Sequence, residues 1–494
     1  MKLVSITLAL AFLFSCSKQN EQKEFSIYNS PVAQLSAISS WSDLAEPQAQ
    51  AQIVVVNTQN EPLAQAEVLI GRAQGSPFKN NFLKTDKNGV VTIPKEWTQP
   101  AHVTVQAAGY IRQTLLNQKP GQIVVKMNPA YLANKALVTG QVTQLPVVNG
   151  DKMIDFGLVM SALTRADLLN FDFGLVISPF NDVLTVAGYN APVPSNVSLP
   201  TQKESYIFNL TVSKPQYRYF SSTLGQRRMY AAGGRFPFKA VVDELRGGKP
   251  FYEVINYFDL KSGGIRDVTL NGQQTQVDIP GNELTFNQAI QITSPTIEAD
   301  EVYVALAASE LGGFLIPTGL KKMPSNTTAT LNTLASQPSY VVSVLKKQSE
   351  FMSQAPGSDR LTASLLPYKA GQKTTLIPLI ADPAISFQNN AYQIQMPPVE
   401  VNTGIYPLAI SAAVSDIQTV TEGDKTITHL IRQWEILGTE WPENIELPQW
   451  PLAATQGKRR LEVNYVAGNK DQNLNLGEEL LKAATHVTHS STDF

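Results

Sequence analysis

The chain has 494 residues, of which 43% are hydrophobic and 16% are charged, with a formal net charge of −2 and a single cysteine. One cysteine excludes a disulfide framework, so the roughly three or four domains that this length allows must be held together by hydrophobic cores. The charged fraction is below the about 25% of typical soluble domains, and the near-neutral balance gives no overall field that would attract nucleic acid.

The first sixteen residues, MKLVSITLALAFLFSC, have the pattern of an export signal. Lys2 precedes an uncharged apolar stretch over residues 3–14, which is too short for the roughly 20 residues that span a bilayer. Residues 13–16, LFSC, resemble the lipobox of bacterial lipoproteins. The resemblance implies a signal peptide over residues 1–15 and lipidation of Cys16, and Ser17 at the next position favours the outer membrane. The alternative is an ordinary signal peptide with a chance cysteine near its cleavage point.

Residues 16–48 are rich in Ser, Gln, Asn, Lys and Glu, which is typical of a flexible tether. From residue 49 to residue 127, short β-branched runs alternate with turn-forming residues and predict a small β-sandwich. The runs are IVVV (53–56), EVLI (67–70), VVTI (90–93), HVTV (102–105) and IVVK (123–126).

Three local features of residues 49–127 resemble the carboxypeptidase regulatory-like domain, a transthyretin-type fold. They are Pro62-Leu63 before an alternating strand, the Thr85-Asp86-Lys87-Asn88-Gly89 turn, and Gly109-Tyr110 at the end of a strand. Asn60 and Gln65 stand where the family usually has glycine, and asparagine tolerates the left-handed geometry that glycine provides. The resemblance implies a fold and a spacer or adhesive role, and it brings no catalytic residues.

The remaining residues are also dominated by strand patterns, divided into β-rich ranges 128–280, 281–398 and 399–494. Short helices are expected at residues 161–170, 237–246 and 477–485, the last with Glu478 and Glu479 in its first turn. The predicted fold class is therefore mainly β, with several Ig-like or transthyretin-like sandwich domains in series and few short helices. The sequence has no repeat of fixed period, which argues against a propeller or a solenoid.

Reactive side chains are scarce, so the sequence predicts no catalytic residue, metal ligand or cofactor. His429 alternates with Ile427 and Ile431, which is typical of a packed sheet face, and no nucleophile-elbow motif is present. His486 and His489 lack further ligands at zinc spacing and fall in what we interpret as a solvated C-terminal tail. The EADE run at residues 298–301 is interpreted as a solvated turn before a strand.

One segment stands out, SKPQYRYFSSTLGQRRMYAAGGRFPFK (213–239), because it carries six basic residues, six aromatic residues and no acid. Aromatic faces stack on sugar rings, and arginine binds carboxylate or phosphate with two donors. The candidate ligand-binding residues are Arg218, Tyr219, Arg227, Arg228, Tyr230 and Arg235. The alternative is a hairpin with its aromatic residues inward and its basic residues outward. Trp441 and Trp450, each followed by proline, are either an exposed binding surface or buried loop anchors.

These features predict a lipid-anchored, outer-membrane protein of the cell envelope, facing either the periplasm or the cell surface. Its expected role is non-enzymatic binding, adhesion or structure, with an anionic envelope glycan or an envelope protein as the partner and no nucleic acid. The alternative is a hydrolase of envelope glycan or peptide that uses the transthyretin-like domain as an accessory, since carboxylate enzymes need no histidine.

Overall fold

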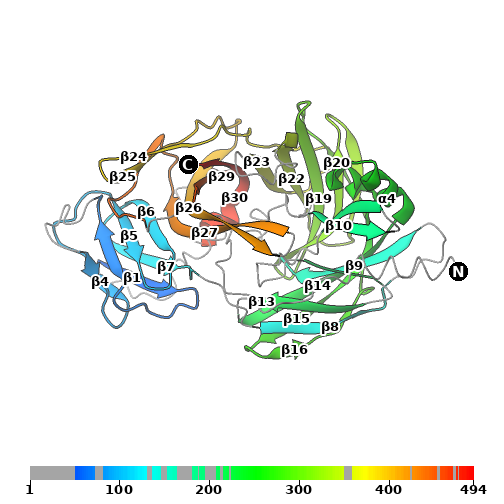
Figure 1. Ribbon diagram of the computed structural model, residues 1–494, viewed down its shortest axis with the longest axis horizontal. Coiled ribbons are helices and arrows are strands. Elements are labelled where there is room, and N and C mark those ends of the chain that lie inside the picture. Colours follow the sequence, from blue (N-terminus) through cyan, green and yellow to red (C-terminus); the bar gives the residue numbers. More distant parts are fainter. Residues whose placement is uncertain are drawn as a thin grey trace. The chain divides into compact units, whose positions relative to one another are not determined.

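The structure is a computed structural model in which strands predominate, as the composition and periodicity predicted (Figure 1). It describes residues 51–72, 82–130, 136–145, 153–163, 181–186, 189–194, 207–211, 215–221, 224–349, 359–422, 425–452, 457–470, 474, 476 and 478–494. Cys16, the tether and most of the predicted helix at residues 161–170 lie outside these ranges. Among the described residues, no helix is both long enough and apolar enough to cross a membrane.

The described residues group into two compact units whose boundaries differ from the predicted domains. Unit 1 contains residues 136–349 and 364–375, and unit 2 contains residues 51–130, 359–363 and 376–494. The predicted ranges 128–280 and 281–398 therefore fall largely in one unit, and the predicted N-terminal sandwich shares a unit with the C-terminal range. The predicted division between residues 280 and 281 directly follows a strand at residues 279–280 and lies inside unit 1.

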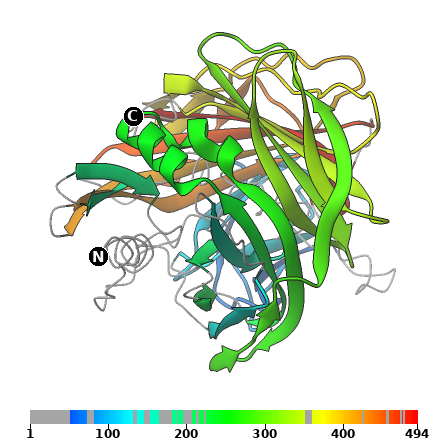
Figure 2. The same ribbon diagram turned by 90° about the vertical axis from the view of Figure 1, so that its right-hand side faces the viewer.

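Unit 1 consists of several sheets, in which most strand pairs are antiparallel and β16 and β17 pair in parallel with β8. It also contains a short helical segment, whose helices are green in Figure 2. Its strands are β8 (Ala136–Thr143), β9 (Ile154–Ser161), β10 (Asn181–Val186), β11 (Tyr189–Pro194), β12 (Ile207–Thr211), β13 (Gln216–Ser221), β14 (Gly225–Phe236), β15 (Asp259–Leu270), β16 (Gln274–Gln276), β17 (Ile279–Pro280), β18 (Leu284–Thr293), β19 (Glu301–Leu311), β20 (Phe314–Met323), β21 (Thr328–Leu334) and β22 (Ser339–Lys347). Its helices are α4 (Phe238–Arg246), α5 (Phe251–Val254) and the 3-10 turn η3 (Ile255–Tyr257). Strand β23 (Leu361–Pro367) contains the change of unit between residues 363 and 364.

Two sheets of unit 1 face each other across a shared apolar core. The six-stranded sheet has the order β12-β9-β14-β15-β18-β21, and the smaller one has β13-β8-β16 with β17 also on β8. Val138 and Tyr217 from the smaller sheet pack with Val159, Met229 and Val268 from the larger one. The alternation of apolar and polar residues in each strand directs these side chains to one face.

Helix α4 confirms the predicted helix at residues 237–246. Val241 and Leu245, four residues apart, lie on one face of the helix and pack against Phe236 and Val254. The helix follows Pro237, and the chain then turns at Gly248, whose φ is +84°. A positive φ at that position suits glycine, which lacks a Cβ.

Unit 2 combines residues from both ends of the described chain. Its strands are β1 (Gln52–Asn57), β2 (Glu67–Ile70), β3 (Leu83–Lys84), β4 (Val90–Thr92), β5 (Ala101–Gln106), β6 (Arg112–Gln118), β7 (Gln122–Met127), β24 (Ala384–Gln388), β25 (Ala391–Gln395), β26 (Tyr406–Glu422), β27 (Lys425–Gly438), β28 (Asn444–Glu446), β29 (Arg459–Gly468) and β30 (Ala484–Asp493). Its short helix α7 (Glu478–Ala483) confirms the one predicted at residues 477–485.

The strand order joins the predicted N-terminal sandwich to the C-terminal strands. Within residues 52–127, one sheet has the order β4-β1-β7 and the other contains β6-β5-β2-β3. Strand β6 then pairs in parallel with β27, Trp434 opposite Arg112, and the sheet continues through β26, β29 and β30. The range 49–127 is therefore not a self-contained sheet system, because β6 is an inner strand and not an edge.

Local turn chemistry in residues 60–89 follows the sequence expectation. Asp86 Oδ1 accepts hydrogen bonds from the backbone N–H groups of Asn88 and Val90, each at 2.9 Å. Gly89 has φ +73°, and a Cβ there would lie 2.5 Å from the Val55 carbonyl oxygen. Asn60 and Gln65, the two departures from glycine, have φ of 64° and 59°. The backbone thus keeps left-handed geometry at both positions, while the family resemblance itself stays a prediction.

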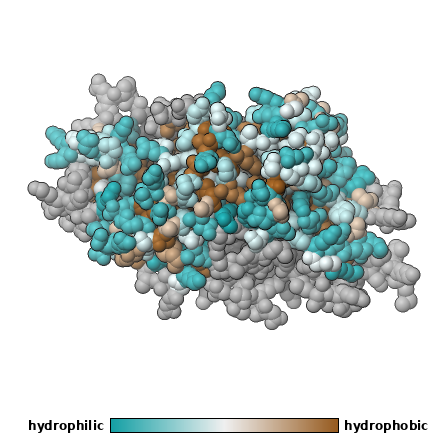
Figure 3. Space-filling view, turned by 90° about the horizontal axis from the view of Figure 1, so that it is seen from above, coloured by the Kyte–Doolittle hydropathy of each residue, from teal (hydrophilic) through white to brown (hydrophobic). Residues whose placement is uncertain are grey.

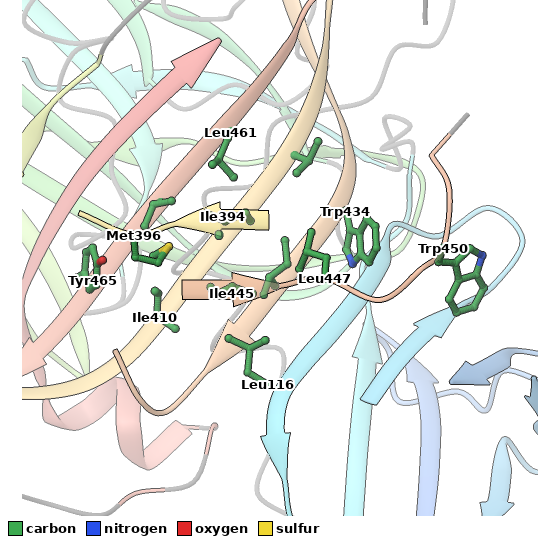
Figure 4. Packing of buried hydrophobic residues seen from close by; sticks show 14 of the residues in the cluster. Leu116, Ile394, Met396, Ile410, Trp434, Ile445, Leu447, Trp450, Leu461 and Tyr465 are labelled. Atoms are coloured by element: carbon green, nitrogen blue, oxygen red, sulfur yellow. The ribbon is translucent and has the colours of Figure 1, made fainter. Parts of the chain in front are cut away.

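The main core of unit 2 lies between the long strands β26, β27 and β29 and the small sheet β24-β25-β28 (Figure 4). Trp434 and Ile410 from the long strands meet Ile394 and Ile445 from the small sheet. Trp434 also donates from Nε1 to Thr114 Oγ1 at 2.8 Å, which satisfies its one polar atom.

On the face of the molecule drawn in Figure 3, hydrophilic residues predominate, with apolar residues gathered between them.

Candidate functional site

The basic and aromatic segment at residues 213–239 is not a hairpin. Its first strand, β13, pairs with β8 in the smaller sheet of unit 1, whereas β14 pairs with β9 and β15 in the larger sheet. The two strands therefore contribute to opposite layers of the same sandwich. Sequence alternation correctly placed Tyr217 and Tyr219 on one face of their strand. It could not show which neighbouring strands β13 and β14 would pair with.

The tyrosines of this segment are core residues. Tyr219 and Tyr230 are both buried, as is Tyr217. The hydroxyl of Tyr230 donates to the Pro317 carbonyl at 2.6 Å, and that of Tyr219 lies 2.9 Å from Ser161 Oγ. Burial raises the pKa of Tyr230 well above its ordinary value. The expectation that Tyr219 and Tyr230 stack on a ligand is corrected, because both rings are buried. Tyr219 lies in the core between the two sheets, whereas Tyr230, which alternates with the core residues Met229 and Ala231, is buried on the other face of β14.

Arg228 is engaged within the protein. Its guanidinium donates to both carboxylate oxygens of Asp267, from Nε at 2.7 Å and from Nη2 at 2.9 Å, and lies 4.9 Å from the centroid of the Phe314 ring. The hydrogen bond from Arg228 lowers the pKa of Asp267. A bidentate pair of this kind fixes the arginine in place and uses the donors that a ligand would need.

Acidic residues on neighbouring strands explain why the segment is less basic in three dimensions than in sequence. Arg235 lies opposite Asp259 of β15 and Asp155 of β9, and Arg228 lies opposite Asp267. Arg235 and Arg227 are half-buried, while Arg218 is exposed on β13. The six candidate residues therefore do not converge on one exposed surface.

A groove in unit 1, which the sequence did not single out, offers a different basic surface. It is lined by residues from β18, β22 and the end of β23 with its following loop: Gln291, Ile292, Val341, Ser343, Leu366, Pro367, Tyr368, Lys369, Gln372, Lys373 and Thr374. None of these lining residues is acidic. Lys369 and Lys373 are both exposed, so two ammonium groups border the groove together with amide and hydroxyl donors.

Hydrogen bonds hold the loop that carries the two lysines. The backbone N–H of Gln372 donates to the Lys369 carbonyl, and Lys373 forms a parallel bridge with Thr293 of β18. Tyr368 is fixed through its backbone N–H to Ser339 and through its hydroxyl, which accepts from the Gln291 N–H at 3.3 Å. Below the groove, Tyr303 links Ser343 and Thr374 with O–O distances of 2.9 and 3.1 Å. These contacts fix the loop at the border of the groove, and the exposed ammonium groups of Lys369 and Lys373 are cations of the kind that bind carboxylate or phosphate.

The histidines are structural where the structure describes them. His486 and His489 belong to strand β30, which corrects their assignment to a solvated tail, and the Nδ1 of His489 lies 2.9 Å from Asn464 Oδ1. Burial, aided by Arg72, lowers the pKa of His102 to about 4, so this ring is neutral at physiological pH. The side chain of His429 lies outside the described set. Within the described ranges, no group of His, Cys, Asp and Glu is arranged to hold a metal ion.

The other sequence candidates also have structural explanations. Asp300 and Glu301 of the EADE run both pair with Lys347, at 3.0 and 3.2 Å, in a turn leading into β19. Trp450 is buried, stacks on Phe82 at 4.4 Å and lies against the Arg112 guanidinium. Trp441 is half-buried, packs against Tyr465 at 4.9 Å between ring centroids and donates from Nε1 to the Ala409 carbonyl at 2.7 Å. Both tryptophans therefore anchor their loops, which is closer to the second of the two predicted alternatives.

Comparison with known proteins assigns no family. No family model matches the chain, and no curated protein matches it. Among solved structures, the chain is similar to the TIE protein of Bacillus anthracis, with 10% identity and a TM-score of 0.14, over 65% of this chain and 48% of that one. The chain thus spans about half the length of the TIE protein. A second is BcpA, the major pilin subunit of Bacillus cereus, with 9% identity and a TM-score of 0.13, over 78% of this chain and 97% of that one. Likenesses this low carry no argument about function.

Proposed function

We propose that this chain is a lipid-anchored, outer-membrane protein of the bacterial cell envelope with a non-enzymatic binding, adhesive or structural role. The observation that carries the binding role is the groove of unit 1, bordered by Lys369 and Lys373 and lined by no acidic residue. Its ligand is an anionic group of an envelope glycan. The sugar-stacking surface expected at residues 213–239 is no part of this proposal.

The chemistry of the groove suits a weakly held anion at the end or side of a polymer. Two exposed ammonium groups four residues apart provide charge, while the Gln291, Gln372 and Tyr368 side chains provide polar contacts beside them. Each exposed ion pair contributes about 0–1 kcal/mol, so a single groove binds weakly. Many copies on one membrane would bind a repeating polyanion more firmly, because binding events on one polymer reinforce each other.

Binding is tested with the full chain in detergent on immobilised polygalacturonate, an anionic glycan, and on neutral dextran. Lys369→Gln/Lys373→Gln should lower retention on polygalacturonate about three- to tenfold at low salt and flatten its salt dependence, since two screened contacts are lost. Lys95→Gln/Lys119→Gln, which removes two exposed charges from unit 2, is the matched control. Equal retention of both double variants would overturn the groove assignment.

The anchor is tested separately at Cys16. Cys16→Ala should move the protein from the membrane fraction to the soluble fraction, because one thioether-linked lipid group and its companion acyl chain are then lost. Radiolabelled fatty acid should label the natural chain and not the variant. Unchanged membrane partitioning with no lipid on the natural chain would defeat the lipoprotein assignment and leave the groove test unaffected.

A further inference from the structure

Unit 2 carries an uncharged β-hairpin made of β24 and β25. Residues 384–396, AISFQNNAYQIQM, contain no charged side chain. Asn389 and Asn390 form the two-residue turn, with φ of 51° and 61°, and Gln388 and Ala391 flank it as opposite residues. Positive φ at both central positions is the geometry that matches the twist of the flanking strands, and asparagine adopts it readily.

Strand β24 is an edge that the sequence leaves unprotected. The small sheet has the order β24-β25-β28, and no other strand among the described residues pairs with the outer side of β24. Phe387 is 55% exposed, more than any other large hydrophobic residue in that set. Natural edge strands are usually blocked by a charge, a proline or a bulge, because their free N–H and C=O groups recruit another strand. None of these devices occurs within β24.

The exposed ring of Phe387 lies at the end of a fixed row of aromatic residues. It contacts Tyr392 at 4.9 Å between centroids, and Tyr392 contacts Phe494 at 6.0 Å. Arg459 donates to the Tyr392 hydroxyl at 3.0 Å and to Asp416 at 2.8 Å, which holds the row in place. The hairpin therefore presents a rigid edge and not a loose loop.

The turn determines which backbone groups point outward. In a two-residue hairpin the flanking residues, here Gln388 and Ala391, form a hydrogen-bonded pair, and such pairs alternate along the ladder. Gln388, Ser386 and Ala384 therefore direct their N–H and C=O groups toward β25. Ile385 and Phe387 direct theirs toward the free edge, two residues apart and on one face of the strand.

We propose that β24 pairs antiparallel with β24 of a second copy of this chain, about a two-fold axis at Ser386. In this register Ile385 of each copy lies opposite Phe387 of the other. The two residue pairs together form about four backbone hydrogen bonds. Each exposed Phe387 ring packs on an Ile385 side chain, and no like charges meet because the strand has none. An interface of two short strands is smaller than the roughly 1,200 Å² of stable complexes, so the pairing is weak in solution and strengthened where copies share a surface.

A single introduced cysteine tests the register. In a Cys16→Ala background the chain has no other thiol, so Ser386→Cys carries the only one. Residue 386 then faces itself in a non-hydrogen-bonded pair, whose Cα separation of about 4.5 Å allows a disulfide. Mild oxidation of the full chain should give at least fivefold more covalent dimer for Ser386→Cys than for Gln388→Cys, which would face residue 384 of the second copy.

Adding Phe387→Lys to Ser386→Cys should abolish the dimer, because each lysine removes the aromatic contact with Ile385 of the second copy and places an uncompensated charge there. Tyr406→Lys, at another exposed aromatic residue of unit 2, is the matched control and should leave dimer yield unchanged. Equal cross-linking of Ser386→Cys and Gln388→Cys, or a monomer in both cases, would overturn the proposal. A mixed disulfide with a different envelope protein would overturn the homotypic pairing as well.

Discussion

The two faces of the long sheet in unit 2 are both buried, yet they have opposite chemistry. One face, with Val414, Trp434 and Leu461, is apolar and packs into the core. The other carries Ser411, Ser415, Arg432, Glu435, Glu462 and Asn464, which the register places on neighbouring positions of β26, β27 and β29. The same strands therefore gain free energy on one side by removing apolar surface from water, and lose it on the other by removing polar groups from water.

The polar face is only partly satisfied by hydrogen bonds. Asn128 donates to Glu435 Oε2 at 3.0 Å, and Arg432 donates to Glu462 at 3.3 Å. Within the part of the chain that the structure describes, Ser411 Oγ, Ser415 Oγ, Glu435 Oε1, Asn464 Nδ2 and both side-chain polar atoms of Gln113 have no hydrogen-bond partner. Each such atom costs about 1–3 kcal/mol, so the free energy that stabilises this sheet comes from burial of its apolar face.

The largest expected effect is on the apolar face. Trp434→Ala should lower the free energy of unfolding by about 3–5 kcal/mol, because it leaves a cavity in the core and removes the donor to Thr114. Chemical denaturation followed by circular dichroism measures the change. Trp434→Phe, which keeps most of the volume, should lose much less; a loss of under about 1 kcal/mol for the alanine variant would show that this face is not the principal source of stability.

A pH-dependent effect of intermediate size is expected on the polar face. Burial raises the pKa of Glu435 from 4.5 to about 7, against the opposing influence of Arg432 and of the Asn128 hydrogen bond. The native state then binds a proton more tightly than the unfolded state, so this group's stabilising contribution is complete below pH 4.5 and is lost as the pH rises through 7. Glu435→Gln should match the natural chain near pH 4.5 and exceed its stability by roughly 3 kcal/mol at pH 8.5.

The readout for Glu435→Gln is the free energy of unfolding at several pH values between 4.5 and 8.5. Parallel curves for the two proteins would show that Glu435 stays ionised in the fold and that Arg432 neutralises it fully.

The smallest effect distinguishes the two faces most directly. Ser411→Ala removes a buried hydroxyl with no partner and should leave the free energy of unfolding unchanged or raise it by up to about 1 kcal/mol. Ala412→Ser, the next residue on the same strand, places a hydroxyl in the apolar core and should lower it by about 1–3 kcal/mol. Thermal denaturation of the pair measures the contrast; equal destabilisation by both would remove the distinction between the faces.

The sequence predicted the β class, the helix at residues 237–246 and the turn at Asp86 because each depends on local chemistry. It did not predict strand partners, since alternation shows which residues share a face and says nothing of the neighbouring strand. Runs such as RQWEILG and RLEVNYV alternate polar with apolar residues and look half-exposed. The structure buries both faces, which a single strand pattern cannot reveal.

The sequence did not indicate the groove of unit 1 for a related reason. Lys369 and Lys373 are ordinary loop lysines in sequence, and only their position beside Gln291 of β18 makes a groove. The sequence overstates the basic charge at residues 213–239, because carboxylates that compensate it, such as that of Asp267, lie outside the segment on a neighbouring strand. A charge count within a window does not include charges that the sheet brings alongside.

The parallel pairing of β6 with β27 has a consequence for how the chain reaches its fold. Residues 112–115 of β6 align with residues 434–437 of β27. One edge of β6 therefore has no partner strand until β27, more than 300 residues later in the chain, has been synthesised and has reached it. Long-range parallel pairing is slow to form because the intervening chain must first be ordered. During that interval the open edge of β6 can pair with a strand of another chain, so the partly folded state is prone to aggregation.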